Sequence, residues 1–212
     1  MLVSNMTRSA GPAKKPRAAS KTAGAAALPN KLRVIGGRWR GTRIEFPPVA
    51  ALRPTPDRVR ETLFNWLQPA IAGARCLDLF AGSGVLGIEA LSRGASYVEL
   101  VDSEPSAGRH LQQTLTRLGA TQGVVHVTDA MRYLDGAARQ FDIVFLDPPY
   151  ASSLLQKACD KLAAAGWLAP DALVYLECPA QEPLPQLPQG WVVHRAKRAG
   201  QVGYHLLRAA RA

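Results

Sequence analysis

The sequence lacks the features that mark secreted, metal-binding and membrane proteins. Its three cysteines, Cys76, Cys159 and Cys178, lie far apart and form no CxxC pair, so we expect buried, reduced thiols and no metal site. No apolar run approaches the roughly 20 residues that a membrane-spanning helix needs, and the N-terminus lacks the apolar core of a secretory signal. These absences favour a cytoplasmic protein with one main domain, for which a hydrophobic fraction of 47% is ample.

Acidic residues are absent from the first 44 positions. Residues 1–44 hold ten lysines and arginines, whereas the rest of the chain holds sixteen basic and sixteen acidic side chains. The net charge of +10 therefore belongs to one N-terminal segment, which favours an arm that binds nucleic acid. A disordered tail that merely keeps the protein soluble is the alternative. Residues 1–30 show no sustained apolar period, and we expect them to be disordered.

A small basic β element is predicted over residues 31–52. Two short strand-like runs flank Gly36-Gly37, and Gly41 marks a second bend. Basic side chains around an aromatic ring favour RNA contact, and they make candidates of Arg38, Trp39, Arg40 and Arg43. The alternative is that Trp39 covers the edge of the core.

An amphipathic helix is predicted within residues 53–70. Thr55-Pro56-Asp57 is typical of a helix start, apolar residues follow at helical spacing, and the helix should end before Pro69. Within it we expect Arg58 and Arg60 to lie on a solvated face or to pair with Glu61, with RNA contact as the alternative. Thr55 is expected to face a bound cofactor or, alternatively, to belong to a rigid cap on the sheet.

From residue 75 onward, strand-like and helical segments alternate. This alternation predicts an α/β fold with a parallel sheet and helices on both faces. The chain closes with two strand-like runs joined by a basic, glycine-containing turn, which predicts a hairpin added to the sheet edge. Arg195, Lys197 and Arg198 in that turn region are further candidates for RNA contact.

A glycine-rich turn follows the first strand of the alternating region. Gly82, Gly84 and Gly87 match G-x-G-x-x-G between a strand and a helix, and such a turn lets a ligand approach the backbone and a helix N-terminus. Asp102 ends the next strand, about 20 residues on, where an acid accepts hydrogen bonds from a ribose. The pattern fits NAD, FAD or S-adenosylmethionine.

Two further acids favour S-adenosylmethionine. Asp78 lies inside the first strand, where a buried carboxylate needs a partner. The ammonium group of S-adenosylmethionine, or the loop amides, would supply one, and NAD has no ammonium. Asp129 ends the third strand, where it could accept from the adenine amino group or cap the following helix.

The fourth strand ends in Asp147-Pro148-Pro149-Tyr150. The carboxyl ends of strands line the ligand crevice of open α/β sheets. Because prolines have no amide donor, this site offers only acceptors, namely the Asp147 carboxylate and the Pro148 carbonyl, beside an aromatic ring. Such a site favours a planar ligand with an amino group, with Tyr150 stacked on its ring and the two amino protons bound by the acceptors.

The DPPY sequence resembles the motif of S-adenosylmethionine-dependent amino methyltransferases. Together with RVIGGRWRG, RPTPDRVRETLFNWL, CLDLFAGSGVLGIEALSRGA and GQVGYHL, it resembles the RsmD family, bacterial methyltransferases of guanine N2 in 16S ribosomal RNA, over residues 32–208. The resemblance implies a Rossmann-like S-adenosylmethionine-dependent methyltransferase fold over residues 53–212, with seven mostly parallel strands and an antiparallel last strand. It also implies a substrate in the assembled small ribosomal subunit or its late assembly precursor.

The candidate residues form three groups. The catalytic candidates are Asp147, Pro148, Pro149 and Tyr150; the cofactor-binding candidates are Thr55, Asp78, Phe80, Gly82, Ser83, Gly84, Asp102 and Asp129; and the RNA-binding candidates are Arg38, Trp39, Arg40, Arg43, Arg195, Lys197 and Arg198. We expect a monomer.

Three other functions share parts of this pattern. The four-residue motif alone would also fit an amino methyltransferase of DNA adenine or of a protein glutamine amide. An NAD-dependent oxidoreductase would share the glycine-rich turn, but it would leave Asp78 and the DPPY motif without a role. A non-catalytic RNA-binding or ribosome-assembly factor would not need an intact cofactor and catalytic site.

Overall fold

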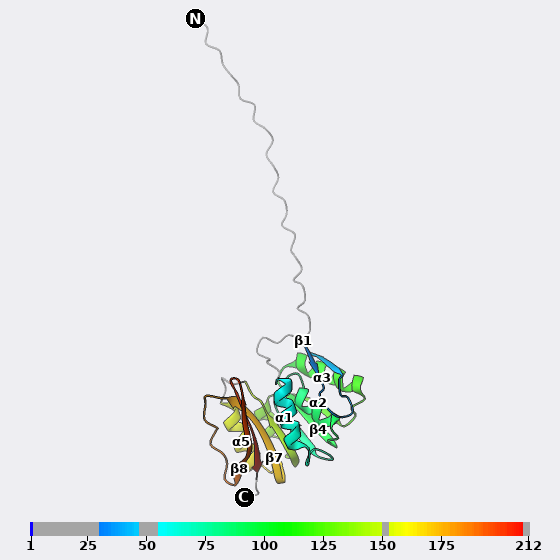
Figure 1. Cartoon of the computed structure of the whole chain (residues 1–212). Coiled ribbons are helices and arrows are strands. Elements are labelled where there is room, and N and C mark those ends of the chain that lie inside the picture. The colour runs from blue at the N-terminus through cyan, green and yellow to red at the C-terminus, as the bar shows by residue number, and fades with distance from the viewer. Residues whose placement is uncertain (2–29, 47–54, 150–152, 210–212) are drawn as a thin grey trace.

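The computed structural model describes Met1 and residues 30–46, 55–149 and 153–209. These residues form a seven-stranded sheet with helices on both faces and a separate two-stranded sheet (Figure 1). The prediction of disorder over residues 1–30 falls almost wholly outside the described residues. In chain order the elements are β1 (Asn30–Arg33), β2 (Arg43–Phe46), α1 (Asp57–Leu67), β3 (Arg75–Asp78), α2 (Val85–Ser92), β4 (Tyr97–Asp102), α3 (Pro105–Leu118), β5 (Gly123–Val127), α4 (Ala130–Leu134), β6 (Phe141–Leu146), α5 (Leu154–Ala164), β7 (Leu168–Pro179), β8 (Trp191–Ala199) and β9 (Val202–Ala209).

The strand order of the large sheet is β5-β4-β3-β6-β7-β9-β8. The first five strands are parallel, whereas β9 runs antiparallel to both β7 and β8. This arrangement confirms the predicted mostly parallel sheet with an antiparallel last strand. The closing hairpin is also present, with β9 inserted between β7 and the edge strand β8. Because β4 and β6 lie on opposite sides of β3, the strand order reverses there, and a ligand crevice is expected at the carboxyl end of β3.

Strand β6 shows how the sheet supports two cores. Ile143 and Phe145 belong to the cluster that α1, α2 and α3 cover, and Val144 and Leu146 belong to the cluster that α4 and α5 cover, because successive strand side chains point to opposite faces. All four are fully buried, and each stabilises the fold by roughly 1.5–3 kcal/mol. From Ile143 to Leu146 the strand is therefore apolar on both faces, and the chain becomes polar again at Asp147, directly after the strand.

Other predictions about the chain can be compared with the described residues. The two short strands expected between residues 32 and 46 are present as β1 and β2, which pair antiparallel. All three cysteines are buried and form no disulfide, as predicted. Within the described ranges, no helix is long and apolar enough to cross a membrane, and no group of three or more His, Cys, Asp or Glu side chains could hold a metal ion.

Helix α1 begins at Asp57 and ends at Leu67, as the sequence predicted. The expectation that Arg60 lies on a solvated face or pairs with Glu61 is wrong, because Arg60 is fully buried. Arg60 precedes the buried Leu63 and Phe64 by three and four residues, so it shares their face of the helix. Its charge therefore has to be compensated inside the protein.

The Arg60 guanidinium binds three segments at once. It donates to the carbonyl oxygens of Thr55 (3.2 Å) and Arg33 (3.0 Å) and to the carboxylate of Asp57, and it lies 3.6 Å from the Glu89 carboxylate. These contacts tie β1, the start of α1 and α2 together.

The Glu89 carboxylate of α2 completes this ion network. Glu89 is fully buried and accepts from the Ile35 amide at 2.9 Å and from the Arg93 guanidinium at 2.7 Å. Because the two partners of the Arg60–Glu89 pair lie on different helices and both bind the β1 region, the small sheet is held against α1 and α2 by buried charge.

We expect the substitution Arg60→Met to reduce the free energy of unfolding by about 3–5 kcal/mol, because it leaves buried acceptors and part of a buried charge without a partner. The matched control is Arg58→Met, which removes an exposed arginine of the same helix and should change stability by less than about 0.5 kcal/mol. Urea unfolding of both variants measures the difference. Equal stabilities would show that the buried network does not stabilise the fold.

Candidate active site

The glycine-rich turn between β3 and α2 has the backbone shape that the sequence predicts. Gly82 and Gly84 have positive φ angles of 51° and 75°, which other residues rarely adopt. A side chain at Gly84 would also place its Cβ 2.2 Å from the Leu111 side chain of α3. In the same turn Phe80 is partly buried and Ser83 is buried. The Leu111 side chain of α3 thus packs tightly against this turn.

Asp78 is buried at the end of β3 behind this turn. Its Oδ2 accepts from the Gly87 amide at 3.0 Å, so a loop amide satisfies part of it, as the sequence analysis allowed. Burial raises the pKa of Asp78 to about 7; the Gly87 hydrogen bond lowers that pKa, and the charge of Asp102 raises it. The carboxylate form is therefore costly unless a cation binds close by.

Asp102 joins the end of β4 to the glycine-rich turn. Its Oδ2 accepts from the Gly82 amide at 2.7 Å, and its Oδ1 accepts from the Glu104 amide at 2.8 Å. These bonds fix the carboxylate at the mouth of the crevice. Contact with a ribose stays a prediction.

Asp129 has the role that the sequence analysis gave as its alternative. It is the N-cap of α4, where its Oδ1 accepts from the Arg132 amide at 3.0 Å. A carboxylate has lone pairs beyond this one bond, so contact with an adenine amino group stays a prediction.

The Asp-Pro-Pro segment lies at the carboxyl end of β6, next to β3. The Leu79 amide donates to the Phe145 carbonyl at 3.2 Å, which keeps the two strand ends side by side. Asp147 is partly buried, Pro148 is buried and Pro149 is exposed. Tyr150 lies outside the described residues, so its predicted stacking role is untested.

Two neighbours of Asp147 come from distant parts of the chain. Thr55 is buried before α1, and its hydroxyl lies within hydrogen-bonding reach of Asp147 and of Glu177, the latter near the end of β7. Its single proton can be donated to only one of the two carboxylates at a time. Burial raises the pKa of Asp147 well above its usual value, the charges of Glu177 and Asp78 raise it further, and the Thr55 hydrogen bond lowers it.

Glu177 was missed by the sequence analysis. It is 3% exposed, its Oε1 accepts from the Tyr175 hydroxyl at 2.7 Å, and burial raises its pKa. The signal was present, because an acid ends the apolar run of residues 173–177 just as Asp78 ends that of β3. Pairing of β7 with β6 is what brings it to Asp147.

These carboxylates create a demand for positive charge. Among the described residues, no lysine or arginine forms an ion pair with Asp78, Asp147 or Glu177. Buried charges are normally paired, so a cationic ligand fits this crevice better than a neutral or anionic one. The glycine-rich turn and the Asp102 carboxylate lie beside this crevice.

The predicted RNA contacts in the β1–β2 turn lie away from this crevice. The Arg38 amide donates to the Ser92 carbonyl at 2.7 Å and the Trp39 amide to Ser92 Oγ at 2.9 Å, so the turn packs on the C-terminus of α2. The eight residues of α2 put that end about 12 Å from the glycine-rich turn. Trp39 is half-buried against the core, as its alternative expected. RNA contact by Arg38, Trp39, Arg40 and Arg43 stays a prediction.

The sequence analysis placed Arg195, Lys197 and Arg198 in the turn of the closing hairpin. The structure places them in the exposed edge strand β8, which continues to Ala199 because these residues pair with β9. Lys197 pairs with Tyr204 of β9, which in turn pairs with Glu177 of β7. Lys197 and Arg198 are therefore level with the carboxyl end of β7, at the crevice edge of the sheet, and Arg195 lies farther back. All three are exposed, and their contact with RNA stays a prediction.

Comparisons with known proteins point to one family. The family described as "Conserved hypothetical protein 95" matches residues 32–208. Ribosomal RNA small subunit methyltransferase D of Escherichia coli K12 is 46% identical over 176 residues, which cover 83% of this chain and 89% of the relative. The protein of that name from Haemophilus influenzae is 41% identical, with 83% and 93% covered. The solved structure of yhhF from Escherichia coli has a TM-score of 0.81 and 42% identity, and covers 86% of this chain and 100% of that chain.

The raised pKa of Asp78 makes a prediction about stability. When a carboxyl group has a higher pKa in the folded state than in the unfolded state, its contribution to the free energy of unfolding falls as the pH rises from the unfolded pKa to the folded pKa. For Asp78 this interval runs from about 4 to about 7. We expect Asp78→Asn to be more stable than the unliganded parent protein at pH 8, by on the order of 1–4 kcal/mol, with a smaller advantage at pH 5.

Chemical unfolding at both pH values measures this change. Asp171→Asn is the control, because it removes an exposed carboxylate. An advantage of Asp78→Asn that is the same at pH 5 and pH 8 would contradict the prediction.

Proposed function

We propose a reaction for this chain on the premise that it belongs to the RsmD family of methyltransferases. In this reaction it transfers a methyl group from S-adenosylmethionine to the exocyclic N2 of a guanine in 16S rRNA of the small ribosomal subunit. The observation that supports this reaction most directly is the acceptor-only end of β6. Asp147 and the Pro148 carbonyl lie there beside the carboxylates of Asp78 and Glu177.

S-adenosylmethionine fits the charge of the crevice. When bound, it supplies an activated methyl group on a sulfonium centre. We assign Asp78 and the amides of the glycine-rich turn to its methionine end and Asp102 to its ribose. Phe80, Gly82, Ser83, Gly84 and Asp129 line the same crevice in this proposal, and Thr55 links it to Asp147. The uncompensated carboxylates support a cofactor that brings positive charge.

Asp147 and the Pro148 carbonyl would act on the guanine amine. That amine is a poor nucleophile, because its lone pair is delocalised into the ring. Two acceptors that bind its two protons favour a pyramidal nitrogen and direct the lone pair at the methyl group. In the in-line displacement the nitrogen–methyl bond would form as the methyl–sulfur bond breaks, with S-adenosylhomocysteine as the leaving group, and the surplus proton of the amine would pass to Asp147 or to water. Positioning would provide most of the rate. Asp147 need not be a full general base, because the amine becomes acidic as it is alkylated.

Asp147 would be the stronger acceptor for an amine proton when it is ionised, because a carboxylate has no O–H of its own to place. Its pKa is raised by burial, by Glu177 and by Asp78, so the site without ligand disfavours the active form. Positive charge beside these carboxylates lowers their pKa values. Cofactor binding and ionisation of Asp147 are therefore coupled in the proposed mechanism.

The proposed substrate is the RNA of the assembled small subunit or its late assembly precursor. Only a base that has left its stack can reach a crevice at the end of a sheet. Basic contacts to phosphate would hold the RNA and add little sequence preference. This substrate places the protein in the cytoplasm, where ribosomes assemble.

We expect labelled methyl groups to pass from S-adenosylmethionine to guanine N2 of small subunits that lack the modification. Asp147→Ala should lose at least about 100-fold in rate, because the amine is no longer held, while cofactor affinity stays within a few-fold. Glu182→Ala, which truncates an exposed acid, is the control. Free 16S RNA, duplex DNA and protein are assayed in parallel as alternative methyl acceptors. Label in DNA or in a protein amide, and none in subunits, would replace the proposed substrate.

We expect Glu177→Gln to change the pH dependence of this reaction. Because the charge of Glu177 raises the pKa of Asp147, its removal lowers that pKa and should move the acid limb of kcat toward lower pH. Methyl transfer measured from pH 5 to pH 9 tests this shift, with Glu182→Gln, an exposed acid, as the control. A uniform loss of rate with an unmoved limb would show that Glu177 is only structural.

A further inference from the structure

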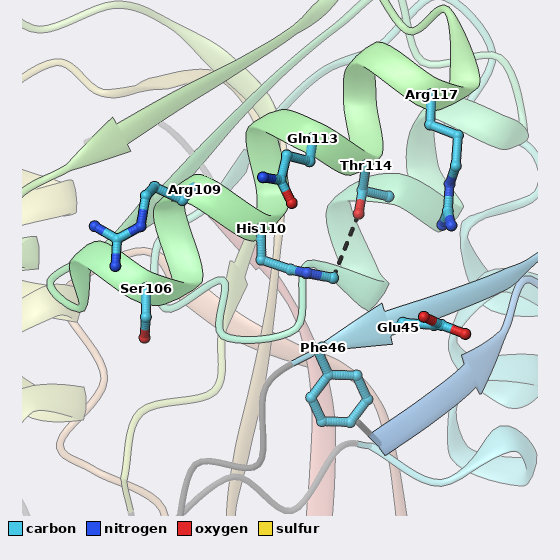
Figure 2. Close-up of a pocket in the computed structure, with 8 residues that line it drawn as sticks. All are labelled: Glu45, Phe46, Ser106, Arg109, His110, Gln113, Thr114 and Arg117. Atoms are coloured by element: carbon cyan, nitrogen blue, oxygen red, sulfur yellow. Dashed lines mark hydrogen bonds between the residues drawn. The ribbon is translucent and has the colours of Figure 1, made fainter. Parts of the chain in front are cut away.

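A groove of about 500 Å³ lies between β2 and α3, outside the crevice. It is lined by Glu45, Phe46, Ser106, Arg109, His110, Gln113, Thr114 and Arg117. Figure 2 shows α3 on one side and β2 on the other, with His110 and Arg117 extending from the helix toward the strand. None of the groove's lining residues was singled out by the sequence analysis, and the proposed reaction uses none of them.

Positive charge predominates in and beside the groove. Arg109 and Arg117 are exposed, and the Arg117 guanidinium is held across the gap by donating one hydrogen bond to the Arg43 carbonyl at 3.0 Å. A guanidinium has five N–H donors, so others remain for a ligand. Burial lowers the pKa of His110, and the charge of Arg117 lowers it further. The two arginines therefore supply the charge.

The nearby acids do not cancel this charge. Glu45 forms an ion pair with Lys31 at 3.0 Å. Glu104 is the N-cap of α3, and its pKa is lowered mainly by hydrogen bonds from Ser106 and to a smaller extent by the charge of Arg109. Four cations, Lys31, Arg43, Arg109 and Arg117, thus stand against three carboxylates, those of Glu45, Glu104 and, at the end of β4, Asp102. The surplus is what a polyanion requires.

The groove leads to the crevice edge of the sheet. Helix α3 begins at Pro105, just beyond Asp102, whose carboxylate lies at the mouth of the crevice. Arg109 and Arg117 lie eight residues apart, or about 12 Å along the helix. A nucleic acid strand presents a charge every few ångströms, so the two arginines can meet separate phosphates of one strand.

The basic N-terminal segment joins the described chain at this groove. Asn30 of β1 pairs with Phe46 of β2, which lines the groove. Residues 1–29 hold five lysines and arginines and no acid. Because the segment and the groove both carry positive charge, the segment is disfavoured as the occupant of the groove. The charge of the segment adds to the attraction for an external polyanion.

We propose that the groove between β2 and α3 binds the sugar-phosphate backbone of the substrate rRNA through Arg109 and Arg117. This inference rests on the proposed function for the identity of the RNA. In it, the strand that follows the groove toward the N-terminus of α3 reaches the crevice edge, where one base enters the site.

The test compares two charge-reversal pairs. Arg109→Glu with Arg117→Glu alters the groove. Lys157→Glu with Arg208→Glu makes the same change of net charge on α5 and β9, away from α3, at exposed positions. We expect the groove pair to raise both the dissociation constant and the KM for small subunits at least 10-fold, with kcat and S-adenosylmethionine affinity unchanged. It should also reduce the slope of log affinity against log salt by about one to two.

The outcomes separate this inference from the proposed function. Subunit affinity and salt slope equal to those of the control pair would overturn the groove site, whatever the methylation result. Failure of the parent protein to methylate subunits would overturn the proposed function, and subunit binding, measured without cofactor, would still decide the groove. If the reversed pair is less stable in thermal unfolding, Arg109→Gln with Arg117→Gln replaces it, and the same shifts at about half the size are expected.

Discussion

The burial of three carboxylates at neighbouring strand ends is the constraint on which the candidate active site depends. Asp78, Asp147 and Glu177 belong to the ends of β3, β6 and β7, which are adjacent in the sheet, and burial raises the pKa of each. Buried carboxylates of this kind are not needed to pack the hydrophobic core. Their presence makes the unliganded site electrostatically unfavourable, and a cofactor that brings positive charge relieves it. In the proposed mechanism the same relief would favour an ionised Asp147 that can accept an amine proton.

The surrounding fold holds this site in place through a second set of buried charges. Arg60 binds the carbonyl of Thr55, whose side chain contacts Asp147 and Glu177, and it binds the carbonyl of Arg33 in β1. The Glu89 carboxylate accepts from the amide of Ile35. The small sheet of β1 and β2 is therefore connected, through the buried side chains of Arg60 and Glu89, to Thr55, which contacts Asp147. The same buried charges thus position both the small sheet and the candidate active site.

Much of the fold was predictable because its causes are local. Strand β6 is a run of apolar residues ending in Asp-Pro-Pro, α1 begins at Asp57, and the turn at Gly82 and Gly84 needs positive φ angles. Each of these depends on residues within a few positions of one another. The spacing of Arg60 to Leu63 and Phe64 already placed it on the apolar face of α1. The partner that makes burial of its charge possible, Glu89, lies far along the chain on another helix, and the sequence pattern did not show it.

The sequence by itself determined the succession of strands and helices along the chain, the glycine turn, the acceptor-only end of β6 and the N-terminal excess of positive charge. Periodicity, turn chemistry and charge are properties of short segments. Only the tertiary structure decided that Glu177 and Thr55 meet Asp147, that the Arg38–Trp39 turn lies against the far end of α2, and that Arg109 and Arg117 face β2 across a groove. These depend on strand order and on helix packing, which join residues that are far apart in the chain.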